Sequence, residues 1–118
     1  MPTDKSRTTG PVLEQTYQFL LWLIPTVDKF PRAQKFLLGD RIQTTALDVL
    51  EGLVEATYTR NRGKLLGRVN LEIERLRFLF RLSVDLKFLD KRRYEFAVRH
   101  LDDIGRQVGG WRKHAQET

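Results

Sequence analysis

The stretch from Lys64 to Leu89, KLLGRVNLEIERLRFLFRLSVDLKFL, decides the fold class. Its apolar residues recur every three or four positions, which is the spacing of one face of an α-helix. One such row contains Leu65, Val69, Ile73, Leu76 and Phe80. Nowhere does the chain alternate apolar and polar residues between turn pairs such as Asn-Gly, as a hairpin of strands would. The sequence therefore predicts an all-α protein.

Three further segments have the same helical spacing. We expect helices from about residue 12 to 29, from about 32 or 39 to 60, and from 90 to the pair Gly109-Gly110. Pro25 falls inside the first of these and should kink that helix or end it early. Four helices with short connections predict an antiparallel up-and-down four-helix bundle.

The bundle should occupy residues 11–113 as a single domain, because a chain of 118 residues has room for one. Residues 1–10 are polar and unpatterned, and we expect them to form a flexible N-terminal tail. We expect residues 114–118 to form a C-terminal tail. Trp111 either covers the end of the bundle or contacts a neighbour or partner, and the first use is the commoner one.

The composition excludes several classes of protein. With no cysteine, the chain has no disulfide, no thiolate metal ligand and no cysteine nucleophile. Its longest apolar run, Phe19 to Ile24, is far shorter than the roughly 20 residues of a membrane span. The first residues lack the apolar core of a secretory signal, so we expect a cytoplasmic protein that does not bind a membrane.

The two middle helices carry more apolar surface than one small bundle readily buries. Beside its inner row, the segment 64–89 has a second apolar row, which includes Leu89, and the preceding helix has flanking apolar residues. Exposed large apolar groups usually mark an interface. We therefore predict that copies of the chain associate through Leu47, Val54, Tyr58, Leu71, Phe78, Leu82 and Leu86. The alternative is that the first helix, which is apolar nearly all round, covers these side chains within one protomer.

Positive charge is in excess and is clustered along the sequence. The net charge is +6 and the isoelectric point is near 10.0, which favours polyanionic partners. Arginine forks suit phosphates and stack on bases. The candidate nucleic-acid-binding residues are Arg60, Arg62, Lys64, Arg68, Arg75, Arg77, Arg81, Arg92 and Arg93. For any single arginine, the simpler interpretation is a solvated side chain near a carboxylate.

The sequence contains no motif for catalysis, metal binding or cofactor binding. Bundles with di-metal sites use Glu-x-x-His, but the residue three before His100 is Ala97, and the residue three before His114 is Trp111. We expect both histidines at the surface. No phosphate-binding glycine loop or nucleophile elbow occurs. We therefore expect no metal, no cofactor, no catalytic residue and no enzymatic activity.

Four stretches of the sequence carry a resemblance to a known family. They are FPRAQKFLLGDRI at 30–42, ALDVLEGLVEA at 46–56, NLEIERLRFLFRL at 70–82 and LDDIGRQVGGW at 101–111. Together they resemble the accessory variability determinant (Avd) proteins of diversity-generating retroelements, over about residues 12–113. The first stretch is shared with a wider four-helix-bundle family that includes proteins encoded by intervening sequences of 23S ribosomal RNA genes. The last stretch favours the retroelement branch.

This resemblance implies an assembly and a function. An Avd-like protein would be an up-and-down four-helix bundle that forms a barrel-like homopentamer and has no enzymatic activity of its own. It would bind the retroelement's reverse transcriptase and its template RNA or DNA. It would thereby support mutagenic, adenine-directed cDNA synthesis and retrohoming. The alternative is an interaction protein of the intervening-sequence type, with no role in a retroelement.

Overall fold

The protein is a bundle of four long helices. A computed structural model describes residues 10–117, so the predicted N-terminal tail lies outside it, except for Gly10. The long helices are α2 (Gly10–Val27), α4 (Asp40–Thr57), α5 (Gly63–Asp85) and α6 (Lys91–Glu117). A short helix, α3 (Arg32–Gln34), and a π-helical turn, η1 (Lys35–Gly39), lead into α4. The described residues contain no strand, and the predicted fold class is confirmed.

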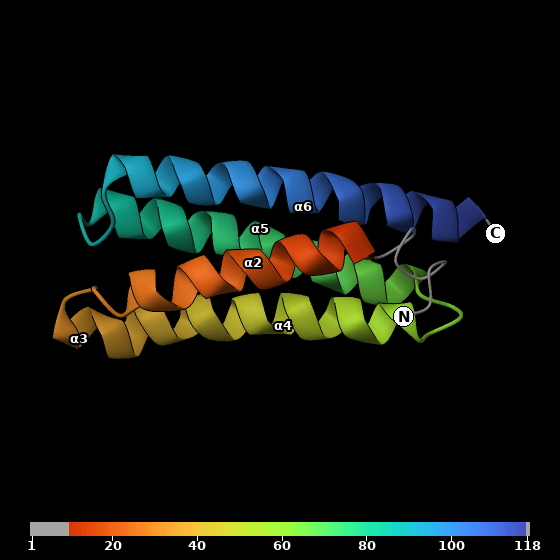
Figure 1. Ribbon diagram of the computed structural model, residues 1–118, viewed down its shortest axis with the longest axis horizontal. Coiled ribbons are helices and arrows are strands. Elements are labelled where there is room, and N and C mark those ends of the chain that lie inside the picture. Colours follow the sequence, from red (N-terminus) through yellow and green to blue (C-terminus); the bar gives the residue numbers. More distant parts are fainter. Residues whose placement is uncertain (1–9, 118) are drawn as a thin grey trace.

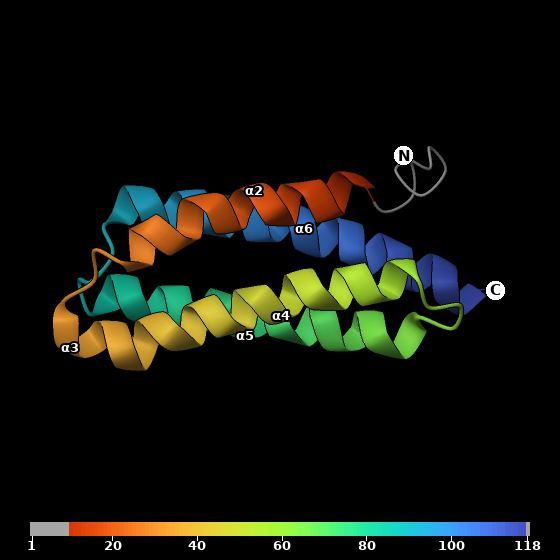
Figure 2. The same ribbon diagram turned by 60° about the horizontal axis from the view of Figure 1, so that its bottom comes forward.

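Consecutive long helices run in opposite directions along the bundle (Figure 1). Helix α5 packs against both α4 and α6, and α2 packs against the same two helices. The four helices therefore form a ring in which α2 lies diagonally opposite α5 (Figure 2). The bundle measures 45 × 26 × 22 Å, so its two ends lie far apart.

Each long helix turns one apolar row inward, as the spacing of its apolar residues predicts. Buried side chains, one from each long helix, are Leu23, Leu53, Phe80 and Leu101. The rings of Phe19 and Phe80 meet edge-on across the bundle, with their centres 6.1 Å apart. The inner row predicted for α5 is wrong only at its start, where Leu66 rather than Leu65 is fully buried.

Two helices end earlier than their apolar pattern suggests. Helix α2 passes through Pro25 and ends two residues later, at Val27, in line with the expected early end. Helix α5 ends at Asp85, and in the turn that follows Lys87 has a left-handed backbone conformation with φ of 65°. This turn returns Leu89 to the core, so the assignment of Leu89 to the outer apolar row is wrong.

The predicted end of the last helix at Gly109-Gly110 is also wrong. Helix α6 continues to Glu117, so residues 114–117 are helical and do not form a tail. Glycine ends a helix mainly when it adopts the left-handed conformation, and no described glycine has a positive φ. Trp111 packs against the core beyond the glycine pair, as expected of a side chain that covers the end of the bundle.

Candidate nucleic-acid interface

One end of the bundle is rich in lysine and arginine. The connection between α4 and α5 lies at the same end as the last turns of α6 (Figure 1). Neither segment 58–70 nor segment 104–116 contains an aspartate or a glutamate. Cations that outnumber the neighbouring acids create a positive local potential. We call this surface the cationic end; its members are Arg60, Arg62, Lys64, Arg68, Arg112 and Lys113. Arg68 is the member nearest to carboxylates, because it lines a hollow with Glu55 and Glu72.

Two contacts join the parts of the cationic end. The Cζ atom of Arg62 lies 5.2 Å from the centre of the Trp111 ring, which is a cation–π contact. Arg112 crosses Gly67, where an added Cβ would lie 3.2 Å from the Cζ of this arginine. The α4–α5 connection, the start of α5 and the end of α6 therefore form one continuous surface.

The charges of the cationic end are not neutralised within the described part of the chain. None of its members forms an ion pair with another described residue. Most of them are exposed to solvent, namely Arg60, Lys64, Arg68 and Lys113. Their charge therefore acts on external anions over a Debye length of about 8–10 Å at physiological salt. Phosphate groups are suitable ligands for such a surface.

Other predicted binding residues lie along the middle of the bundle, where they are paired with carboxylates. These pairs are Arg75 with Glu72 at 3.0 Å, Arg77 with Glu74 at 3.3 Å and with Asp102 at 2.7 Å, and Arg81 with Asp85 at 4.0 Å. The pairing leaves little net positive charge in this region. Binding a phosphate here would also require an existing ion pair to break.

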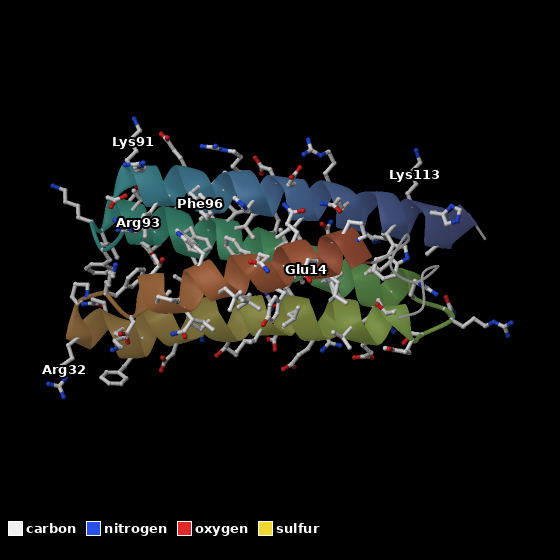
Figure 3. The ribbon with its side chains drawn as sticks, viewed as in Figure 1. Glu14, Arg32, Lys91, Arg93, Phe96 and Lys113 are labelled. Carbon is white, nitrogen blue, oxygen red and sulfur yellow. The ribbon has the colours of Figure 1, made fainter. Side chains whose placement is uncertain are left out.

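Arg92 and Arg93 lie at the opposite end, at the start of α6. Figure 3 shows Lys91 and Lys113 projecting outward near the two ends of this helix. Arg93 is paired with Asp90. The pKa of Asp90 is lowered, chiefly by the hydrogen bond that the Arg93 amide donates at 2.8 Å. The structure therefore gathers the predicted residues of the α4–α5 connection and separates them from the others.

A polar contact joins α2 to α6 in the middle of the bundle. Gln15 Nε2 donates to Asp103 Oδ2 at 3.2 Å, and Gln107 Nε2 donates to Gln15 Oε1 at 2.6 Å. The hydrogen bonds from Gln15 and then from Arg106 lower the pKa of Asp103. The charges of the middle region are thus used within the protomer.

All the residues predicted to lie between copies of the chain are exposed. Their exposed fractions range from 40% for Leu47 to 74% for Tyr58. The alternative, in which the first helix covers them, is wrong, because these side chains remain open to solvent with α2 in place. The structure adds exposed apolar residues on α2 and η1, namely Tyr17, Leu21, Ile24, Phe36 and Leu37. Association through these residues stays a prediction.

The first group of these apolar side chains lines a groove between α4 and α5. We call this group the α5 face; it comprises Phe36, Leu37, Leu71, Phe78 and Leu82. Leu86 follows Leu82 by four residues and so extends the same side of α5. The rim of the groove carries charged residues of both signs.

The second group lies on the other side of α4. Gly52 of α4 faces α5, since an added Cβ would lie 2.6 Å from Val69 Cγ2. Leu47 and Val54 are about 140–160° around the helix from Gly52, which places them towards α2. On α2, Trp22 faces α6, and the exposed apolar residues lie on its other side. We call this group the α2–α4 face; it comprises Tyr17, Leu21, Ile24, Leu47 and Val54.

The comparison with known proteins covers almost the whole bundle. A family model described as bAvd-like matches residues 12–115. The chain belongs to the bAvd-like family. The resemblance to Avd proteins predicted from the sequence is therefore confirmed. A comparison with curated proteins finds no matching sequence.

Two members of the cationic end of this bAvd-like chain are not among the residues predicted from the sequence. Arg112 and Lys113 lie beyond Gly109-Gly110, where the sequence predicts that the helix ends. A signal for them exists, because the buried row of α6 continues at a helical spacing. Its apolar members are Ala97, Leu101, Ile104 and Val108, and Arg112 comes four residues after the last of them.

Of the two histidines predicted to lie at the surface of this bAvd-like chain, His114 is exposed and His100 is only partly exposed. The ring of His100 lies 4.2 Å from the ring of Phe96, and its Nδ1 donates to the Phe96 carbonyl oxygen at 3.0 Å. It therefore belongs to an aromatic cluster between α2 and α6. No group of three His, Asp or Glu residues within the described range could hold a metal ion. No helix of the described chain is both long and apolar enough to cross a bilayer.

Proposed function

We propose that this bAvd-like protein is a non-catalytic accessory protein of a diversity-generating retroelement. It binds RNA or DNA together with the retroelement's reverse transcriptase, and it thereby supports mutagenic cDNA synthesis and retrohoming. The observation that carries the proposal is the cationic end, whose cations have no carboxylate partner among the described residues. Membership of the bAvd-like family supports the retroelement context.

Nucleic acid is the partner that suits the cationic end best. Each phosphate that a lysine or arginine neutralises releases counterions, which is the main source of sequence-independent affinity. The side chains of Arg60 and Arg68 are exposed and make no ion pair with other described residues, so binding breaks no ion pair of theirs. The arginines of the middle region contribute less because they are already paired.

Self-association is the second part of the proposal. The α5 face and the α2–α4 face lie on different sides of the protomer, so one copy can use the first face to meet the second face of its neighbour. Such a head-to-tail contact closes into a ring if the rotation between copies allows it. The family resemblance suggests five copies. A ring would carry several cationic ends and would hold a polyanion at several points at once.

The proposed polymerase partner is tested by copurification. The protein, tagged and coexpressed with the reverse transcriptase of its own retroelement, should copurify with that enzyme and with the template RNA. Primer extension on the template should then depend on the accessory protein, because it holds the template and the enzyme together. Equal extension and equal error with and without the protein would contradict the proposal.

A second candidate function is that of an interaction protein of the ribosomal intervening-sequence type. The exposed apolar faces favour it, because they would serve any protein partner. The two functions differ in genomic setting. A neighbouring reverse transcriptase gene with a template and variable repeat pair supports the first, and a gene within a 23S ribosomal RNA intervening sequence supports the second.

A further inference from the structure

Two arginines make similar contacts where α5 packs against α6. Arg77 of α5 reaches across Gly105 of α6, where an added Cβ would lie 3.0 Å from its Nη2 atom. Arg112 of α6 reaches across Gly67 of α5 in the same manner, with its Cζ and Nη2 atoms 3.2 Å from an added Cβ. In both places the glycine leaves room for the guanidinium group. The two sites therefore share the same local packing of an arginine over a glycine of the neighbouring helix.

The surroundings of the two guanidinium groups differ in charge. Arg77 lies 2.7 Å from Asp102 and 3.3 Å from Glu74, so its charge is balanced within the protomer. Arg112 has no carboxylate partner among the described residues. The Nε atoms of Arg77 and Arg112 are both buried and have no hydrogen-bond partner in the described part of the chain. The two sites therefore differ in their carboxylates and not in this N–H group. A partly buried guanidinium group without a carboxylate partner loses hydration and gains no ion pair in return.

The position of Arg112 in α6 explains why its side chain lies against α5. It follows Val108 by four residues and so continues the buried row of the helix. A leucine at this position would extend the core at no electrostatic cost. The residues around it, in segments 58–70 and 104–116, include several cations and no carboxylate. The group that could complete the contacts of Arg112 is therefore an anion from outside these segments.

We propose that Arg112 is the anchor of the cationic end, where its guanidinium group binds a phosphate of the nucleic-acid backbone. Arginine binds phosphate oxygens through two parallel N–H donors, which a lysine cannot do. Arg62, stacked on Trp111, and the exposed cations Lys64 and Lys113 strengthen the local field. This inference rests on the proposed function, since it names the residue by which the same surface holds nucleic acid.

The test compares Arg112→Leu with Arg99→Leu. Arg99 lies on the same helix, is exposed and makes no ion pair with another described residue, so both variants lose one charge. The probe is a fluorescently labelled uridine 20-mer, titrated at low salt and at a temperature where circular dichroism finds all proteins folded. Arg112→Leu should bind at least about tenfold more weakly than Arg99→Leu. Arg112→Lys should recover only part of the loss, because it restores the charge without the fork.

Thermal unfolding without the oligonucleotide gives the second readout. Removing an unbalanced cation should leave the Tm of Arg112→Leu equal to or above that of Arg99→Leu. A clearly lower Tm would assign Arg112 a structural role and overturn the inference, as would equal affinities of the two variants. If the unaltered protein binds no oligonucleotide at low salt, the nucleic-acid part of the proposed function fails as well. If the unaltered protein binds the oligonucleotide and the two variants bind it equally well, the proposed role of Arg112 is refuted while nucleic-acid binding stands.

Discussion

Arginines are paired with carboxylates in the middle of the bundle, whereas within residues 10–117 the cations of the cationic end are not. In the middle, arginines such as Arg77 are balanced by carboxylates of the same or a neighbouring helix, and large apolar side chains such as Phe78 are exposed beside them. At the cationic end, the cations have no such partners among the described residues, and even the partly buried Arg112 is unbalanced. Both regions belong to the same helices, α5 and α6.

This difference indicates which partner each region suits. A neutralised surface with exposed leucines and phenylalanines is suited to protein, because association removes apolar area from water. An unbalanced basic surface is suited to a polyanion, because binding replaces counterions. The following variants test the division, beginning with the largest expected effect.

Removing charge from the cationic end should weaken nucleic-acid binding most. The variant replaces Arg60, Arg62, Lys64 and Arg68 by alanine. We expect its affinity for a labelled single-stranded RNA to fall on the order of 100-fold at about 0.1 M salt, because several phosphate groups are no longer neutralised by the protein. Fluorescence anisotropy measures the affinity.

The matched control removes the same number of charges from the middle. It replaces Arg75, Arg77, Arg81 and Arg106 by alanine, and all four are paired with carboxylates in the unaltered protein. We expect a loss of less than about tenfold, because the unpaired acids left behind act only through the general field. A larger loss in the control than in the first variant would reverse the assignment of the two regions.

Polar substitutions on the α5 face should separate the copies without unfolding the protomer. The variant replaces Leu71, Phe78 and Leu82 by glutamine. These side chains are about half exposed or more, so the bundle itself loses little, and the mass from light scattering should fall to the protomer value of 13.9 kDa. Nucleic-acid affinity should fall about tenfold because separated protomers no longer bind jointly through several cationic ends. An unchanged mass would show that the α5 face is not part of the interface between copies.

Alanine at glycine positions should have opposite effects in the two regions. At Gly110, an added Cβ meets nothing within 4 Å, so Gly110→Ala should raise the free energy of unfolding by up to about 1 kcal/mol through helix propensity. At Gly52 the added Cβ would lie 2.6 Å from Val69 Cγ2, so Gly52→Ala should lower it by about 1–3 kcal/mol. Urea unfolding measures both. A lower free energy of unfolding for Gly110→Ala would mean that α6 near Gly110 is packed as closely as α4 is at Gly52.

Acid should weaken the middle through Asp103, and this is the smallest effect. Its pKa is lowered in the folded protein, so its contribution is present above the ordinary value of 3.8 and is lost as the pH falls through the folded pKa. The Tm difference between the unaltered protein and Asp103→Asn should therefore exist near neutral pH and shrink below pH 3.8. A difference that is constant with pH would show that the charge of Asp103 does not matter.

Much of this division could be predicted from the sequence, because helical periodicity depends on local spacing. The inner row of α5 and the exposure of Leu71, Phe78 and Leu82 follow from the 3.6-residue repeat. Pairing of Arg77 with Asp102 could not be predicted, because it depends on the alignment of two helices. Arg112 was missed for a different reason: the helical spacing of α6 continues to it, but whether a glycine pair ends a helix depends on what packs beyond it, here Trp111.

The most direct test of the account is the salt dependence of nucleic-acid binding by three proteins. These are the unaltered chain, the variant without four charges at the cationic end, and the control without four in the middle. The logarithm of the association constant should fall linearly with the logarithm of salt concentration for the unaltered chain. The slope should become shallower by about 0.7 for each phosphate of the single strand that the cationic-end variant no longer neutralises, and it should stay nearly unchanged in the control. Equal slopes for the two variants would contradict the account.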